Sequence, residues 1–150
     1  MARRHDSLLP LTHDHHHALR NARMLRLAAD GGVPVRIEAA EGFLRFFRSE
    51  GVAHFREEEE VIFPLVALHE NAPTSGIQRV LSEHVVMHAL VRELEEQTKA
   101  GGPAGQTMLT LAELLKAHVR FEEDELFPAI EELVPDRLSD VSLAKRSRTS

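Results

Sequence analysis

Two stretches of this chain, HFREEEEVIFP at residues 54–64 and HVRFEEDELFP at residues 118–128, nearly repeat each other. In both, a histidine is followed four and five residues later by two glutamates, and a Phe-Pro pair closes the stretch. A histidine and a glutamate four residues apart lie on one face of an α-helix. The repeat therefore has two compatible explanations: a duplicated helical hairpin with a common end signal, or two helices that deliver the same pair of ligands.

The surrounding sequence predicts further helices. Glycine and proline interrupt the chain at residues 31–34, 71–73 and 101–105, and between these points the apolar residues recur at helical spacing rather than in alternation. The predicted helices run from about Thr12, as N-cap, to Ala29, from Val35 to Leu68, from Thr74 to Ala100 and from Gln106 to Val134. Short connections make consecutive helices antiparallel. The expected fold class is all-α, an up-down-up-down antiparallel four-helix bundle with a metal centre in its core.

The length of 150 residues fits one domain. We assign residues 1–135 to the bundle and residues 136–150 to a polar C-terminal tail with nothing to pack against, which we expect to be disordered. The two longest helices are longer than a small bundle needs. We expect a bend or break at Pro64 and Pro128, because proline removes a backbone donor and crowds the preceding turn.

Composition excludes several classes of protein. With 43% hydrophobic and 28% charged residues the chain can form a core, so it is not predicted to be disordered as a whole. No apolar run is long enough for a transmembrane helix, and the N-terminus lacks the apolar stretch of a signal peptide. The absence of cysteine excludes disulfides and thiolate metal sites. A net charge of −6 argues against nucleic-acid binding. We expect a cytoplasmic protein with no membrane or nucleic-acid partner, and any protein partner is left open.

Histidine is unusually frequent, with ten in the chain. Five histidines and two glutamates lie on the apolar stripes that the bundle must bury: His15, His54, Glu58, His84, His88, His118 and Glu122. The others share faces with arginines or lie near chain and helix ends: His5, His13, His16, His17 and His69. The histidines therefore divide into a predicted buried set and a predicted surface set.

A metal site explains the buried set. One inward histidine is usually a hydrogen-bonded core residue, but burying seven ionisable groups without partners would be very costly. The ligands are too many for one tetrahedral zinc and too rich in nitrogen for calcium or magnesium. They suit two transition-metal ions bridged by two carboxylates, with iron as the first choice. The protease motif H-E-x-x-H is absent because Val85 follows His84, and the Glu-x-x-His motif of ferritin-like proteins is absent as well.

In the order and spacing of these residues, the sequence over about residues 8–134 resembles the hemerythrin-like, or HHE cation-binding, domains, and its Phe-Pro endings are similar to those of bacterial members. The resemblance implies a di-iron centre. His84, His88 and His118 would hold one iron, and His15 and His54 the other, which would keep an open position for O₂. Glu58 and Glu122 would bridge the irons together with an oxo or hydroxo group.

Several neighbouring residues are alternatives. Glu123 stands where the invertebrate oxygen carriers have their bridging aspartate, but Glu122 lies nearer the His118 face and is preferred. His16 is the substitute for His15 on a more polar face, and Glu50 is a possible hydrogen-bond acceptor for an imidazole. The simplest role for Glu57, Glu59 and Glu60 is a charged outer face.

Three functions are compatible with such a centre. The first is a non-enzymatic protein that binds O₂ or a related small ligand for storage, sensing or delivery, in a pocket lined by Leu, Val, Phe and Met because the chain has no Trp or Tyr. The alternative is a redox enzyme acting on hydrogen peroxide or nitric oxide, although no side chain identifies itself as an added acid or base. A further alternative is an iron or oxygen sensor in which metal loading stabilises the fold.

Overall fold

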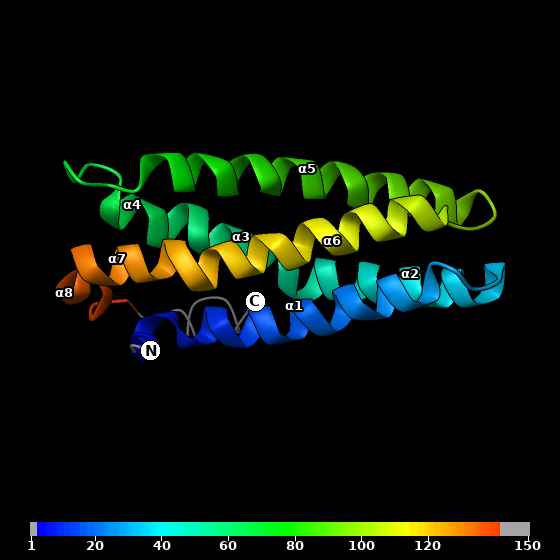
Figure 1. The fold of residues 1–150 in the computed structure, drawn as a ribbon, viewed down its shortest axis with the longest axis horizontal. Coiled ribbons are helices and arrows are strands. Elements are labelled where there is room, and N and C mark those ends of the chain that lie inside the picture. Colours follow the sequence, from blue (N-terminus) through cyan, green and yellow to red (C-terminus); the bar gives the residue numbers. More distant parts are fainter. Residues whose placement is uncertain (1–2, 142–150) are drawn as a thin grey trace.

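The structure, a computed structural model, describes residues 3–141, and every regular element in that range is helical (Figure 1). Those elements are the 3₁₀ turn η1 (Asp6–Leu8), α1 (Leu9–Ala28), α2 (Val33–Phe46), the π-helical turn η2 (Phe47–Gly51), α3 (Val52–Glu57), the π-helical turn η3 (Glu58–Ile62), α4 (Phe63–Val66), α5 (Thr74–Lys99), α6 (Gly105–Phe121), the π-helical turn η4 (Glu122–Leu126), α7 (Phe127–Leu133) and α8 (Pro135–Leu138). None of the helices in this range is both long enough and apolar enough to span a membrane.

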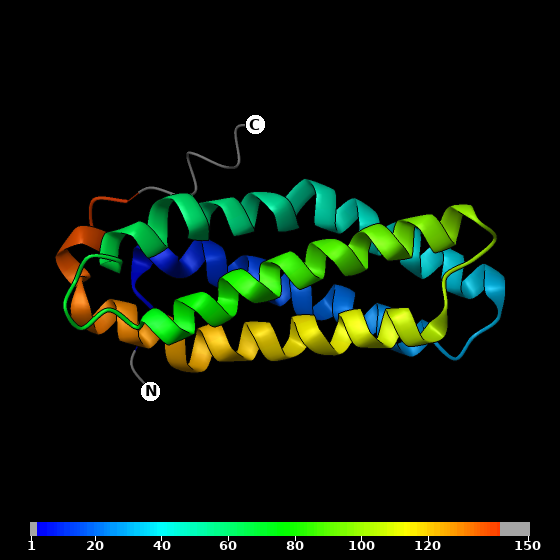
Figure 2. The same cartoon turned by 90° about the horizontal axis from the view of Figure 1, so that it is seen from above.

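The elements form an elongated helical bundle, which confirms the all-α prediction. The ribbon reverses direction at the connections after α1, α4 and α5, so that α1, α2–α4, α5 and α6–α7 run beside one another (Figures 1 and 2). The predicted ends lie within about three residues of the observed ones, and the main exception concerns Thr12. The helix already begins at Leu9 with Pro10 in its first turn, so Thr12 lies inside α1 and is not its N-cap.

The predicted interruptions take the form of π-helical turns that end directly before Phe63-Pro64 and Phe127-Pro128. In each, the N–H of the phenylalanine donates to the carbonyl of the glutamate five residues earlier, Glu58 or Glu122. A proline in an α-helix cannot donate to the carbonyl four residues before it and clashes with that group. The wider turn relieves this clash while the chain stays helical. The glutamates of the repeat therefore begin the two π-turns.

The apolar interior of the described residues consists of two clusters. One includes Phe43, Phe47 and Leu111, and the other includes Leu11 and Phe127. The inward-facing histidines and glutamates of the four helical segments lie between these clusters along the bundle axis, since each segment contributes apolar residues on both sides of its ligand residues. The fold thus holds one polar layer inside an apolar core.

The start of the expected tail differs from the prediction. Residues 135–138 form α8, and the Leu138 side chain is fully buried in the second apolar cluster. Two hydrogen bonds fix this helix: Arg137 Nη1 donates to the carbonyl of Leu65 at 3.0 Å, and the Ser7 hydroxyl donates to the carbonyl of Leu138. The sequence offers Leu138 as a lone apolar residue in polar surroundings, which is too weak a pattern to predict its burial. Residues 142–150 of the expected tail lie outside the described residues.

Packing of α8 makes a stability prediction. Replacing Leu138 with Ala should lower the free energy of unfolding by about 2–5 kcal/mol, because the substitution removes a fully buried side chain. Leu68→Ala is the matched control, since Leu68 is 99% exposed and its loss should change the free energy by less than about 0.5 kcal/mol. Urea denaturation followed by circular dichroism measures both values. Equal effects of the two substitutions would contradict the packing of α8.

Candidate metal centre

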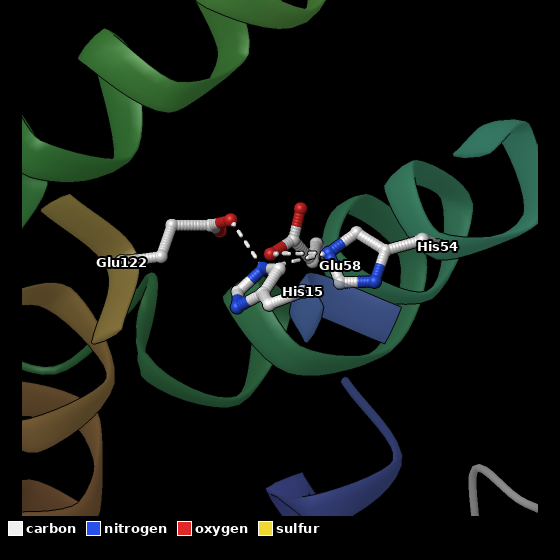
Figure 3. Close-up of side chains that lie close together, drawn as sticks. All are labelled: His15, His54, Glu58 and Glu122. Atoms are coloured by element: carbon white, nitrogen blue, oxygen red, sulfur yellow. Dashed lines mark hydrogen bonds and ion pairs between the residues drawn. The ribbon is translucent and has the colours of Figure 1, made fainter. Parts of the chain in front are cut away.

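Six of the seven predicted ligand residues meet in the polar layer at the middle of the bundle. They come from all four helical segments and are all buried: His15 on α1, His54 on α3, Glu58 at the start of η3, His84 on α5, His118 on α6 and Glu122 at the start of η4. Figure 3 shows His15, His54, Glu58 and Glu122 pointing toward one another from different parts of the chain. The layer brings together imidazole nitrogens and carboxylate oxygens, the donor set of transition metals.

The first group of candidate ligands is His15, His54, Glu58 and Glu122, each of which offers a donor atom within 4.8 Å of the others. His15 Nε2 lies 3.1 Å from both His54 Nε2 and Glu122 Oε1. His54 Nε2 lies 3.3 Å from Glu58 Oε2. Separations of this size are what donor atoms adopt when they share one ion at about 2.0–2.2 Å.

The second group is Glu58, His84 and His118. Glu58 Oε1 lies 3.1 Å from His84 Nε2, while the other oxygen of the same carboxylate faces His54. Glu122 Oε1 lies 3.1 Å from Nε2 of His118 and the same distance from Nε2 of His15. Each carboxylate is therefore placed between one imidazole of the first group and one of the second, as a bridging ligand would be.

The missing hydrogen bonds of these donor atoms also support a metal site. Within the described residues, five buried atoms of this layer have no hydrogen-bond partner: both oxygens of Glu58, Oε2 of Glu122, and Nε2 of His84 and of His118. Buried polar atoms are almost always hydrogen-bonded, so a cluster of unpaired ones needs an explanation. Bound cations would satisfy all five atoms and neutralise the two carboxylates.

Each of the four imidazoles also meets a second carboxylate through its outer nitrogen. The Nδ1 atoms of His15, His54, His84 and His118 lie 2.6, 3.0, 2.7 and 2.8 Å from Glu123, Asp14, Glu59 and Glu83 respectively. A carboxylate at Nδ1 favours the tautomer that carries its proton there, which leaves the Nε2 lone pair free to face an ion.

The imidazole contacts of three of these acidic residues were missed in the sequence. Glu59 is exposed, as expected for an outer face, but its carboxylate also accepts from His84. Asp14 and Glu83 were not considered, although each directly precedes a buried histidine, which is a signal that a search for Asp-His or Glu-His pairs would find. Glu123, the alternative bridging residue, occupies the outer side of His15, while Glu122 lies in the cluster.

His88 does not join the cluster, and the prediction that it lies in the core is wrong. Its side chain is exposed, and its ring packs edge-on against Phe47 and Phe55 with centroid separations of 5.3 and 5.8 Å. At this level of α5 the buried residue is Met87. Four residues turn an α-helix slightly more than one full turn and shift the side chain by about 6 Å. That displacement takes His88 beyond the polar layer, to a level where aromatic rings fill the interior.

The remaining alternatives also have definite places. His16 is exposed, and Glu50 pairs with the exposed His17 at 2.9 Å instead of with a buried imidazole. Glu57 is buried, which differs from the expected outer face, whereas Glu60 is exposed and pairs with Arg56 at 2.8 Å.

Burial and charge strongly shift the titration of the layer. Burial and the neighbouring charge of Glu122 raise the pKa of Glu58 well above its usual range. Burial alone would lower the pKa of His118, but the charge of Glu122 and the hydrogen bond with Glu83 raise it to about 10. His15 follows the same pattern, since Glu122 and Glu123 outweigh its burial and raise its pKa. When no metal is bound, these shifts favour a protonated Glu58 carboxyl and protonated imidazoles beside the Glu122 carboxylate.

A small cavity adjoins the cluster between α1, α2–α3, α5 and α6. Its wall includes His15, His54 and His118 together with apolar side chains from all four helical segments: Ala18, Phe43, Phe46, Phe47, Phe55, Met87, Leu111, Leu115 and Val119. The centre of a water-sized molecule can occupy about 20 Å³ of it, which is space for one water or one diatomic molecule. Only Asp14 and Glu50 add carboxylates to the wall.

Comparison with known proteins agrees with this geometry. The family model described as hemerythrin HHE cation binding domain matches residues 8–130, a range that includes every residue of the cluster. No curated protein and no solved structure matches the chain.

The placement of His84 and His88 makes a prediction about metal content. His84→Ala should lower the number of metal ions bound per chain, because it removes a donor of the second group. His88→Ala, the same change one turn further along α5, should leave that number unchanged. Elemental analysis of protein reconstituted with Fe²⁺ measures both. Loss of metal from the His88 variant would contradict the exclusion of His88 from the centre.

The raised pKa of His118 makes a prediction for the metal-free protein. Because folding raises this pKa from 6.5 to about 10, the stabilisation is complete below pH 6.5 and is lost as the pH rises toward 10. The free energy of unfolding should fall by up to about 1.4 kcal/mol per pH unit across this range. Urea denaturation at several pH values measures the slope, and His118→Gln should flatten it. An equal slope in the variant would contradict the assignment.

Proposed function

Because the chain belongs to the hemerythrin HHE cation-binding domain family, we propose that it is a non-haem di-iron protein that binds O₂ or a related small ligand, for storage, sensing or delivery. The observation that carries this proposal is the position of the apolar cavity directly against His15, His54 and His118. A small neutral molecule could reach the centre there without displacing a protein ligand.

Two irons would be held by two imidazoles each and by the shared carboxylates. His15 and His54 would bind one ion, His84 and His118 the other, and Glu58 and Glu122 would contact both. When bound, iron would supply the electrons that a reduced O₂ ligand needs. Without His88 this set holds four imidazoles instead of the five that the family resemblance implies, so neither ion is enclosed by protein donors alone.

The surrounding side chains would select the ligand and protect it. Phenylalanine, leucine, valine and methionine side chains form most of the cavity wall, and they exclude water from the space beside the imidazoles. By keeping water and its protons away from the imidazoles, these side chains would protect a small ligand held there. The space of about 20 Å³ suits a diatomic molecule and is too small for an organic substrate.

Turnover of hydrogen peroxide or nitric oxide is the second candidate function. The observation in its favour is that Asp14 and Glu50 line the same cavity, so two carboxylates could hold or pass a proton at its wall. A sensing role is the third candidate. In its favour, the polar layer lies between the two apolar clusters, where metal binding would contribute to the stability of the whole bundle.

A cavity-filling substitution tests the proposed function. Ala18 lines the cavity one turn from His15, and Ala18→Val would occupy part of the available space. We expect the iron content to stay unchanged and the affinity for azide (oxidised protein) or O₂ (reduced protein) to fall at least tenfold. Ala22→Val, the same change one turn further along α1, is the control, since Ala22 does not line the cavity. Absorption spectroscopy of iron-loaded protein during ligand titration measures both affinities.

The same measurements separate the candidates. A stable O₂ adduct in the reduced protein supports binding, whereas rapid oxidation with turnover of peroxide or nitric oxide above that of free iron supports the enzyme. Binding of zinc but no iron by the metal-free protein would refute the di-iron centre itself.

A further inference from the structure

The four outer carboxylates connect the helices in a closed sequence. We propose that Asp14, Glu59, Glu83 and Glu123 form an interhelical ring of positioning residues that fixes the orientation of all four buried imidazoles, with Nδ1 turned outward and Nε2 turned to the centre, before metal arrives. The inference rests on the proposed metal centre but concerns the metal-free protein, so it can be tested separately.

The ring follows from which helix each partner belongs to. Asp14 on α1 holds His54 on α3, and Glu59 on η3, in the same helical segment, holds His84 on α5. Glu83 on α5 in turn holds His118 on α6, and Glu123 on η4, which continues α6, returns to His15 on α1. The imidazole of each helical segment thus contacts a carboxylate of the segment before it, and the ring carboxylate of each segment contacts the imidazole of the segment after it. No segment holds its own histidine.

The arrangement has a regular sequence basis. On α1 and α5 the carboxylate directly precedes the histidine, in Asp14-His15 and Glu83-His84. On the two segments of the repeat the order is different: His54 and His118 are followed four residues later by a bridging glutamate and five residues later by the ring carboxylate. Consecutive residues of a helix point about 100° apart. One residue of each acidic pair can therefore face the centre while the other faces the neighbouring helix.

Physical chemistry gives the ring its role. An imidazole ring has two nitrogens, and a metal can bind only the one that lacks a proton. The ring carboxylates lie 2.6–3.0 Å from Nδ1, so they can accept a hydrogen bond from that nitrogen and turn Nε2 toward the centre at all four positions. Two ring members are themselves held by arginines: Arg4 lies 3.3 Å from Glu123, and Arg79 lies 3.2 Å from Glu83. Removal of Glu83 or Glu123 should lower the affinity of the centre for metal, even though neither carboxylate would contact the ion.

Glu83 offers a direct test, because it lies on α5 and the imidazole that it contacts, His118, lies on α6. In metal-free Glu83→Ala, nitrogen-15 NMR of the imidazoles should show His118 losing its Nδ1–H signature, and the affinity for Co²⁺ should fall about 10–100-fold. Glu83→Gln keeps an oxygen acceptor, so it should largely restore both the NMR signature and the affinity. Glu125→Ala is the control, since Glu125 is exposed and lies outside the ring. Circular dichroism establishes that each variant is folded.

The outcomes are distinct. Loss of the Nδ1–H signature at His118 in Glu83→Ala, with rescue by Gln, supports the ring. A His118 Nδ1–H signal in Glu83→Ala that is unchanged from that of the parent protein would overturn it. If Glu83→Ala unfolds, Asp14→Ala and the His54 signal provide the same test on another link. Because the NMR readout needs no iron and no O₂, a failure of the proposed function would leave this result standing.

Discussion

Two carboxylates buried side by side set the main constraint on this protein. Glu58 and Glu122 are fully inaccessible to solvent and lie on neighbouring helices in an apolar core. Such a pair is stable only if one carboxyl takes up a proton, as the raised pKa of Glu58 favours, or if positive charge is brought to it. Protonated imidazoles supply that charge in the metal-free protein, as the raised pKa of His118 shows, and metal ions are the natural replacement. The bridging geometry, the outer carboxylates and the division of the core all follow from this requirement.

The polar layer also explains why the bundle is built from long helices. An isolated buried charge would need water. Here the four helical segments supply partner groups to one another within the layer, and each segment is long enough to form an apolar cluster on both sides of it. The π-turns place the two glutamates at the same relative positions on their segments, each five residues before Phe-Pro. Proline, which usually ends a helix, here lies in the Phe-Pro pair that directly follows a π-turn beginning at the glutamate, and the chain stays helical through it.

Much of this architecture could be predicted from the sequence, because helical periodicity and glycine and proline positions are local signals. The burial of His15, His54, His84 and His118 followed from apolar neighbours one turn away. His88 shows the limit of that argument: it shares the spacing, but the interior beside it is filled by Phe47 and Phe55 from another helix. The role of Glu59 was equally inaccessible, since it depends on which helices are neighbours. A sequence pattern predicts which residues share one face of a helix, but it does not predict which residues of other helices that face packs against.

Placing the ligands on both ends of the chain has a consequence for how the protein is made. His15 and Glu122 are 107 residues apart in sequence, yet their side chains lie 3.1 Å apart in the centre. No shorter piece of the chain contains both, and the ring of carboxylates closes only through Glu123. A ribosome therefore has to synthesise nearly the whole domain before any intact centre can exist. If the centre binds metal as proposed, that step would come late in biogenesis, after the final helix has docked onto the first.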